Sequence, residues 1–326
     1  MSAETFADLS DTLFGAAIAI YGAAAVAFCA ELAFGRRSVP SATAQRAAVP
    51  VGGRGGTAEP GPVAEPVDNY APSGRWGRVG VILTGLGALA QTGVLIGRSA
   101  AAGRVPWGNM YEFATASVLV GVVAYLVLAI RVPGFQRIGV FILGPTVVGL
   151  VLIGMYLYAE SGPLVAALRS NWLVVHVSAA IVSFGVFMVS GIASALYLVA
   201  ASGARSSATD DDRASGWADK LPSAAALDRV AHRTAVFGFP IWTFAVIAGA
   251  IWAESAWGRF WGWDPKETWA FISWALYAAY LHARSTAGWR GRPSAWINVV
   301  AFSSLVFNLL FVNLVSTGLH SYGGVS

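Results

Sequence analysis

Long apolar stretches separated by short polar segments run through most of this sequence. Eight of them are long enough to cross the hydrocarbon core of a membrane as helices, which takes roughly 17–25 residues each. They cover Thr12–Phe34, Val79–Gly97, Met110–Ile130, Ile138–Tyr158, Trp172–Ala201, Ala235–Ala253, Glu267–Ala283 and Trp296–Gly318. Their many Gly and Ala residues favour closely packed helices. The pattern therefore predicts an all-α fold, a polytopic membrane helical bundle of about eight transmembrane helices.

Composition supports a membrane protein over a soluble one. The 326 residues are 56% hydrophobic and only 12% charged, and the mean hydropathy is +0.62. A soluble domain needs more charge than this on its surface. The first apolar stretch lacks a basic N-terminal region and a clear cleavage site, so we expect a retained helix and not a signal peptide. Cys29 is the only cysteine, which excludes an internal disulfide or CxxC redox chemistry.

The distribution of basic residues predicts the orientation. The loops 35–78, 131–137, 202–234 and 284–292 contain sixteen of the 21 Lys and Arg residues. The five on the other side are Arg98, Arg104, Arg169, Arg259 and Lys266. Because cytoplasmic loops carry the excess of basic residues, we expect a multi-pass cell-membrane protein with both termini outside the cytoplasm. The net charge of +4 thus reflects topology, and no nucleic-acid partner is expected.

The same pattern divides the chain into three parts. Residues 1–35 contain the first transmembrane helix. Residues 36–78 are predicted to form a flexible cytoplasmic linker, because the segment 36–75 holds six of the fourteen prolines and no periodic apolar pattern. Residues 79–326 form a membrane domain of seven helices.

A tryptophan-rich segment on the outer side is the most unusual feature of the chain. The sequence WAESAWGRFWGWDPKETWAFISW, residues 252–274, holds six of the thirteen tryptophans. Indole tolerates a membrane interface and offers a flat apolar face with one donor. We therefore predict a surface that holds a large planar apolar ligand. The residues assigned to it are Trp252, Trp257, Trp261, Trp263, Asp264 and Trp269.

A purely structural interpretation of this segment is the alternative. Asp264 suits a helix N-cap, Pro265 the first turn, and Glu267 the third position of a capping box, so the segment starts the seventh helix. An interfacial aromatic belt would accompany that start. This interpretation explains Asp, Pro and Glu, but not the surrounding tryptophans.

Histidines are rare, and ionisable side chains within membrane spans point to function. Successive spans cross the membrane in alternating directions. His176 near the start of the fifth span and His320 just past the eighth are therefore expected on the same outer face as the tryptophans. Two opposed imidazoles across a flat aromatic pocket could serve as axial ligands of a haem iron. The alternative is a pair of helix-end histidines bonded to backbone carbonyls.

The other two histidines lie elsewhere. His282 is about fifteen residues into the seventh helix, roughly 23 Å from its start at ~1.5 Å per residue, so it lies toward the cytoplasmic side. It is either a ligand of a second, inner haem site or an interfacial residue beside Arg284. His232 lies between Arg229 and Arg233 and is interpreted as a surface residue.

These motifs resemble a known family. WGRFWGWDPKETW is similar to the "WWD" motif of haem-handling membrane proteins, and its WDPKETW end resembles the CcsA (ResC) branch, the system II cytochrome c synthase. NWLVVHV at His176 and TGLHSYG at His320 resemble the two external-histidine motifs of that branch. YLHAR at His282 is similar to its membrane histidine, and PWGNMYEF at 106–113 to a further short motif. The likeness covers residue 79 to the C-terminus.

The resemblance implies a function for the domain 79–326. Haem b would move outward across the membrane and be held at the WWD face by His176 and His320, with Asp264 assigned with them to the reaction. The haem vinyl groups would then form thioethers with the CxxCH cysteines of a secreted apocytochrome c. A CcsB (ResB)-type subunit is the implied partner, and it would complete an inner haem site with His282.

Other possibilities remain at this stage. Lys266, Arg259 and Arg169 are candidates to pair the haem propionates, or they are outer-face residues that extend to water. A b-type electron-transfer cytochrome subunit would also use paired histidines, but it has no need of a tryptophan platform. A transporter with an aromatic vestibule would bind no haem.

Overall fold

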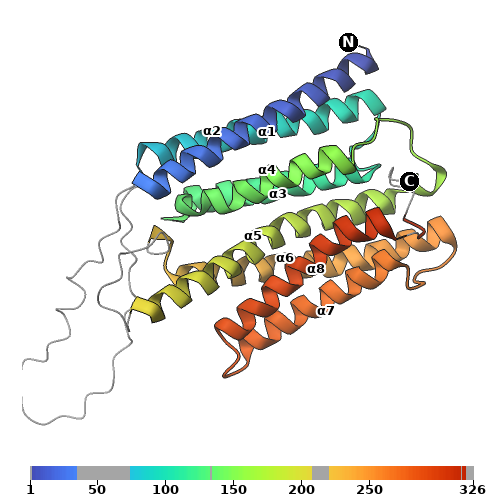
Figure 1. Cartoon of the computed structure of the whole chain (residues 1–326). Coiled ribbons are helices and arrows are strands. Elements are labelled where there is room, and N and C mark those ends of the chain that lie inside the picture. The colour runs from blue at the N-terminus through green and yellow to red at the C-terminus, as the bar shows by residue number, and fades with distance from the viewer. Residues whose placement is uncertain (1, 35–73, 133, 208–219, 317, 321–326) are drawn as a thin grey trace, which may run out of the picture.

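The computed structural model describes residues 2–34, 74–132, 134–207, 220–316 and 318–320, which fold as helices without a strand. Eight long helices run side by side (Figure 1). They are α1 (Ala3–Phe34), α2 (Arg75–Ala102), α3 (Met110–Arg131), α4 (Gly139–Tyr156), α5 (Asn171–Ser207), α6 (Ala224–Trp257), α7 (Pro265–Ser285) and α8 (Arg292–Val315). Short 3-10 helices, η2 (Phe135–Ile138) and η3 (Ala166–Leu168), precede α4 and α5. The predicted all-α bundle is confirmed.

Seven of the described helices are long and apolar enough to span a membrane, and α7 is the exception. Its first turn carries Glu267, and its last turn carries His282 and Arg284. The predicted seventh span therefore forms a helix that is less apolar than the others. The start of α1 and the end of α8 lie at the same end of the bundle, because the eight helices alternate in direction (Figure 1). We call this the N-terminal end.

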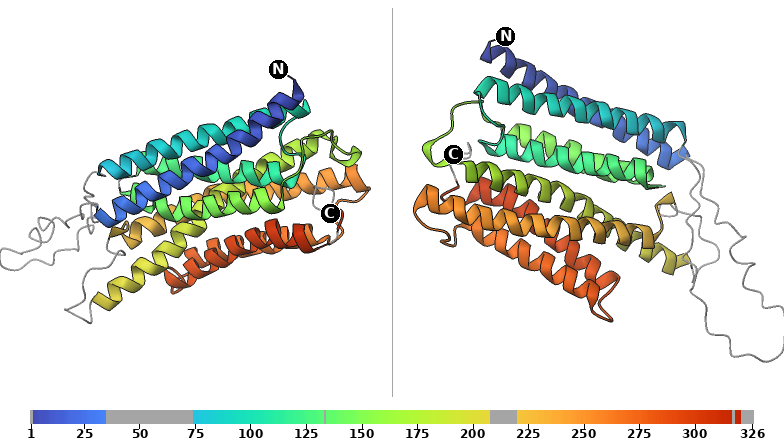
Figure 2. Two further views of the ribbon diagram at one scale, coloured as in Figure 1. Left: turned by 45° about the horizontal axis from the view of Figure 1, so that its top comes forward. Right: turned by 180° about the vertical axis from the view of Figure 1, so that it is seen from behind.

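Helices α1–α4 and α5–α8 form two neighbouring groups, and both further views show the same arrangement (Figure 2). Close packing within and between them depends on glycine. A Cβ at Gly87 of α2 would lie 2.5 Å from Tyr21 Cε1 of α1. A Cβ at Gly185 of α5 would lie 2.6 Å from the Gly121 nitrogen of α3, so this pair brings the two groups into backbone contact. This is the small-residue packing expected between membrane helices.

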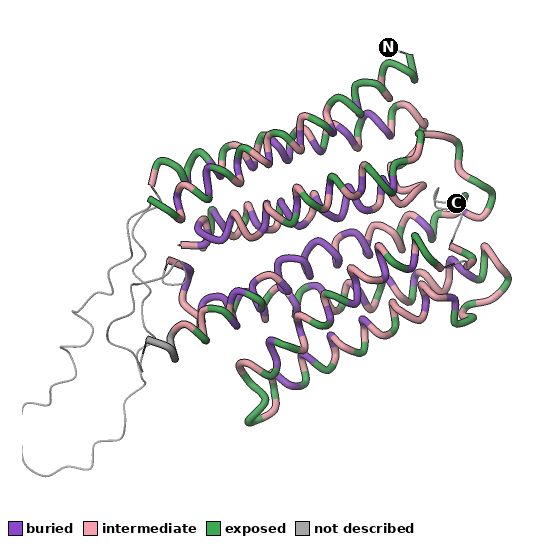
Figure 3. Tube along the Cα trace, viewed as in Figure 1, coloured by how far each residue is buried: buried purple, intermediate pink, exposed green. Residues whose placement is uncertain are grey.

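Helix α5 is the most buried of the spans and lies at the centre of the bundle (Figure 3). Buried polar bonds fix its neighbour α8. The Asn298 amide of α8 donates to the hydroxyls of Ser190 (2.9 Å) and Ser194 (2.7 Å) on α5. Interhelical bonds of this kind are typical of membrane bundles. They hold α8 in a fixed register against α5, which matters because the segment after α8 carries His320.

The proposed division of the chain into a first helix, a linker and a seven-helix domain stays an expectation. Residues 35–73, most of the linker 36–78, lie outside the described residues. Helix α2 begins at Arg75, four residues before the stretch Val79–Gly97 that the sequence marks as apolar.

Candidate functional site

A cavity of about 180 Å³ lies at the N-terminal end of the bundle, among α3, α5, α6, α7 and α8. His176, His320 and three of the tryptophans, Trp252, Trp257 and Trp261, line it together. Most other lining residues are aromatic or aliphatic. Segments that are far apart in the sequence therefore meet in one apolar chamber that contains two imidazoles.

His176 is fixed in the wall of this cavity by α6. Its Nδ1 lies 2.7 Å from the carbonyl oxygen of Ala245, and a carbonyl only accepts, so Nδ1 carries the proton and Nε2 keeps its lone pair. The ring stacks on Trp252, with centroids 6.0 Å apart and planes at 10°. Gly249 allows this approach, because a Cβ there would lie 2.7 Å from the imidazole.

His320 is fixed by the start of α7. Its Nδ1 donates to Asp264 Oδ2 at 2.8 Å, and the Leu319 amide donates to Asp264 Oδ1 at 2.8 Å. The carboxylate thus ties the segment after α8 to the N-terminus of α7. A carboxylate on the Nδ1 proton is the usual outer partner of a metal-binding histidine, because it fixes the tautomer and orients Nε2. The ring lies edge-on to Trp252 and Trp257, with centroids 5.8 and 4.9 Å apart.

The protonation states of this pair follow from its surroundings. Burial lowers the pKa of His320 below its ordinary value, although the Asp264 carboxylate acts in the opposite direction. Burial acts to raise the pKa of Asp264, but the hydrogen bonds from His320 and Leu319 outweigh it, so this pKa is lowered. At neutral pH the pair is a carboxylate and a neutral imidazole, which is the form that binds a metal.

The tryptophans divide between the cavity and the surface. Trp252 is 2% exposed, and its Nε1 donates to the Ala167 carbonyl at 3.1 Å. Trp263 is 65% exposed and meets Trp261 and Phe271 edge-on. Trp269 packs on Phe307 of α8, with centroids 4.3 Å apart. The structure therefore brings Trp252, Trp257 and Trp261 to the cavity and places Trp263 and Trp269 away from its lining.

Trp263 has a φ of 57°, the left-handed conformation that bulky residues rarely adopt. Glu267 holds the backbone on both sides of it, because its Oε2 accepts from the amides of Gly262 (2.8 Å) and Asp264 (3.0 Å). The capping box predicted at the start of α7 is present. This helix start and the cavity wall are consequently the same structure, so the cap and ligand interpretations are compatible.

A second wall of the cavity comes from the loop before α3 and the first turn of α3, which sequence reasoning did not assign to the site. Trp107, Gly108, Asn109, Met110 and Phe113 all line the cavity, and they belong to the PWGNMYEF motif. Phe260 and Trp242 are further aromatic lining residues that the sequence did not single out. The motif was a usable signal for the first group, whereas the other two needed the folded chain.

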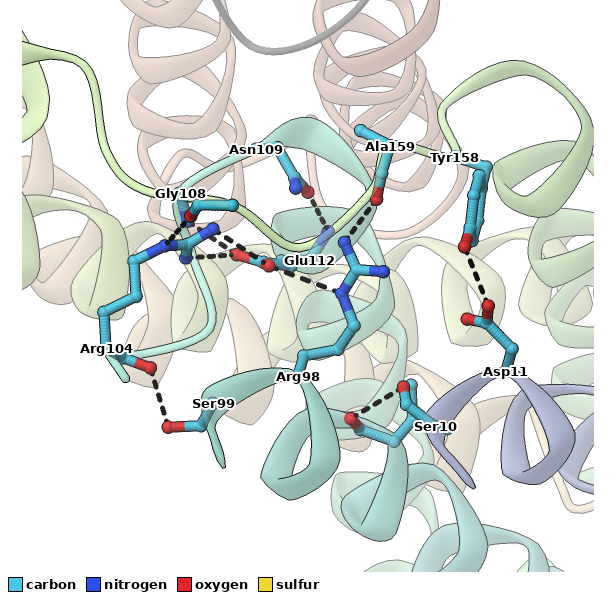
Figure 4. A network of polar contacts seen from close by, with 12 residues as sticks. Ser10, Asp11, Arg98, Ser99, Arg104, Gly108, Asn109, Glu112, Tyr158 and Ala159 are labelled. Carbon is cyan, nitrogen blue, oxygen red and sulfur yellow. Dashed lines mark hydrogen bonds and ion pairs between the residues drawn. The ribbon is translucent and has the colours of Figure 1, made fainter. Parts of the chain in front are cut away.

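A buried ionic cluster holds this loop in place (Figure 4). Glu112, which is fully buried, accepts from Arg104 Nη1 (2.8 Å) and from the Gly108 amide (2.7 Å), and Arg98 Nε lies 3.4 Å from its Oε1. Asn109 Oδ1 accepts from the Glu112 amide at 2.9 Å and caps α3. The cluster thus joins α2, the loop and α3 beside the cavity.

The remaining predicted residues lie apart from this site. His282 is exposed in the last turn of α7, at the end of the bundle opposite the cavity. His232 meets Tyr280 edge-on, with centroids 6.5 Å apart. Within the described ranges, no group of three or more His, Cys, Asp or Glu residues is placed to hold a metal ion. Among the described residues that line the cavity, His176 and His320 are the two histidines.

Residues 107–320 match the family model of the cytochrome C assembly protein. The chain belongs to this family. It is 36% identical to the cytochrome c biogenesis protein CcsA of Synechococcus elongatus over 275 residues, 72% of this chain and 84% of that protein. The CcsA protein of Thermosynechococcus vestitus is 34% identical over 281 residues, 76% of this chain and 86% of the relative. The resemblance predicted from the motifs is confirmed, and so is a role in cytochrome c biogenesis.

A solved structure shares the fold. The cytochrome c heme lyase CcmF superposes with a TM-score of 0.60 over 95% of this chain and 47% of that one, at 16% sequence identity. At this identity the likeness concerns the fold alone. The matched family region begins at Trp107 and ends at His320, so it includes every element that lines the cavity.

Proposed function

We propose that this protein binds haem b as its substrate in the cavity between His176 and His320 and presents it for attachment to apocytochrome c. One observation carries the proposal: both imidazoles use Nδ1 for a bond within the protein, to Ala245 and to Asp264. With the proton on Nδ1, Nε2 is the ring nitrogen that carries the lone pair, and both imidazoles line an aromatic cavity. Two neutral imidazoles and flat aromatic walls suit the iron and the macrocycle of a haem.

The reaction needs positioning more than acid–base chemistry. Each thiol of a CxxCH motif adds across one haem vinyl group, so that a C–S bond forms and the thiol proton passes to the vinyl carbon. The addition needs no net oxidant or reductant once the thiols are reduced. The protein would hold the haem rigidly, which lowers the entropic cost of bringing the two partners together. His176, His320 and Asp264 are the residues assigned to this task.

Transport and orientation extend the proposal. We place the cavity, the WWD segment and both termini outside the cytoplasm, on the basis of the basic residues in the opposite loops. His282 lies on the exposed face of α7 at the other end, where a haem would need its second ligand from another chain. A CcsB/ResB-type subunit that supplies this ligand is the proposed partner. Synthase activity would then belong to the complex, with haem entering at His282.

Covalent haem attachment to a reporter tests this function. A secreted CxxCH peptide or apocytochrome is co-expressed with the full chain and its membrane partner in cells that lack other maturation systems. We expect a covalent haem stain on the reporter with the wild-type chain and none with His176→Gly or His320→Gly at equal protein level. Haem binding without any attachment would favour a b-type electron-transfer subunit. Absence of haem from the purified chain would favour the transporter.

A further inference from the structure

One cation lies among the apolar walls of the cavity. Among the described residues that line it, Lys266 is the one lysine or arginine. Lys266 is the second residue of α7, where the helix dipole disfavours a cation. The ammonium is also partly withdrawn from water, which costs further free energy. Neither packing nor helix formation explains a lysine at this position.

The surrounding carboxylates do not pair with it. Asp264, two residues earlier in the chain, uses one oxygen for the Leu319 amide and the other for His320. Glu267 accepts from two backbone amides and pairs with Arg259, Nη1 to Oε2, at 3.6 Å. Within the described part of the chain, Lys266 makes no ion pair or side-chain hydrogen bond. Its charge therefore remains available to a ligand.

The two arginines considered as alternatives for the propionates, Arg259 and Arg169, are already engaged. Arg259 pairs with Glu267, and the Arg169 Nε donates to the Leu164 carbonyl at 3.1 Å. Neither arginine is among the residues that line the cavity. Lys266, in contrast, lines it together with His320, and the same two residues also line a smaller cavity of about 10 Å³ between α7 and the segment after α8. That space is roughly the size of one water molecule.

We propose that Lys266 binds the carboxylate side arms of the haem and so sets which edge of the macrocycle faces inward. This assignment rests on the proposed function. A haem is apolar except for its iron and its two propionates, and the cavity offers two imidazoles for the first and one cation for the second. With the propionates held at Lys266, at the start of α7, the vinyl edge on the far side of the ring is left for the thiols. Lys266 is thus a positioning residue.

The test measures how much the propionate charges of the haem contribute to binding, separately from its iron and its ring. The purified full chain is titrated with haem and with haem dimethyl ester, whose propionates are blocked. We expect the wild type to bind haem about 10- to 100-fold more tightly than the ester, as a charge-assisted bond implies. Lys266→Met should remove this difference by weakening haem alone, and Lys266→Arg should retain most of it. Arg259→Met and Arg169→Met are matched controls and should keep the wild-type ratio.

Several results would overturn the assignment. Equal losses of haem and ester in Lys266→Met would show that the lysine supports the fold or the iron ligation. If Arg259→Met lost the preference for haem over the ester and Lys266→Met kept it, Arg259 would be the residue that binds the propionates. If Lys266→Met fails to accumulate, the wild type alone tests the assignment. Equal affinities of the wild type for haem and for the ester would exclude any cation that binds the propionates. Failure of the wild type to bind either porphyrin would overturn the proposed function itself.

Discussion

Two buried polar clusters lie side by side at the N-terminal end of the bundle, and they differ in how their charged and polar groups are paired. In the Glu112 cluster, the carboxylate meets Arg98, Arg104 and a backbone amide, so each charged group has a partner of opposite charge within the protein. In the cavity, His176 and His320 are each fixed through Nδ1, and Lys266 has no ion pair among the described residues. A matched cluster stabilises one conformation, whereas a cation without an ion pair beside two neutral imidazoles suits a ligand.

The largest effect should come from the matched cluster. Glu112→Gln removes the buried charge between two guanidinium groups, so we expect a loss of roughly 3–5 kcal/mol of stability and little folded protein. Thermal unfolding in detergent measures it. Asp228→Asn is the control, because it breaks the partly exposed Arg284–Asp228 pair (2.7 Å) and should cost about 1 kcal/mol or less. Equal stability of the two variants would contradict a structural role for Glu112.

Removal of the Asp264 carboxylate should affect the ligand more than the fold. In Asp264→Ala, His320 loses the acceptor on its Nδ1, and outer partners of this kind typically contribute about 10- to 100-fold in metal affinity. Asp264→Asn keeps an oxygen acceptor and should lose less. Haem titration at matched protein levels distinguishes them. Wild-type affinity in the alanine variant would show that Asp264 serves only the start of α7.

The tryptophans should show a smaller, graded effect. Trp257→Leu and Trp261→Leu each remove a flat ring from the cavity, and we expect about a 3- to 10-fold loss of haem affinity from each. Trp263→Leu changes a ring that is 65% exposed and should stay within about 2-fold. Haem affinities of the three variants provide the comparison. A larger loss at Trp263 than at Trp257 would place the ligand on the outer surface.

The smallest effect is a pH dependence of the ligand-free protein. Because the pKa of folded His320 is lowered, the unfolded chain takes up the proton first, and stability should decline as pH falls below about 6.5. The lowered pKa of Asp264 adds a decline below about pH 4. His320→Gln should reduce the first decline, measured as the shift in melting temperature between pH 7.5 and pH 5.5. An unchanged shift would place that titration at other groups.

Much of the fold could be predicted, because long apolar stretches in the sequence predict membrane helices. The eight predicted spans correspond to α1–α8. The exception was α7, which is less apolar than the other helices because its first turn carries Glu267 and its last turn carries His282 and Arg284.

The site was only partly visible from the sequence. Parity along the spans placed His176 and His320 on one face, and the structure brings them into one cavity. Parity cannot show which way a ring points, so Trp263 and Trp269 could not be separated from Trp257 and Trp261. The partner of each Nδ1 could not be predicted either. Ala245 is 69 residues from His176 in the chain, and Asp264 is 56 residues from His320.

The most direct test of the account is the axial ligation of the bound haem. The wild-type chain, loaded with ferric haem, should give the absorption and paramagnetic resonance spectra of a low-spin haem with two histidine ligands. His176→Gly and His320→Gly should each lose this spectrum and most of the haem, and added imidazole should partly restore both, because glycine leaves a space of imidazole size. Full haem content with an unchanged low-spin spectrum in the double variant would contradict the central claim that these two histidines hold the haem.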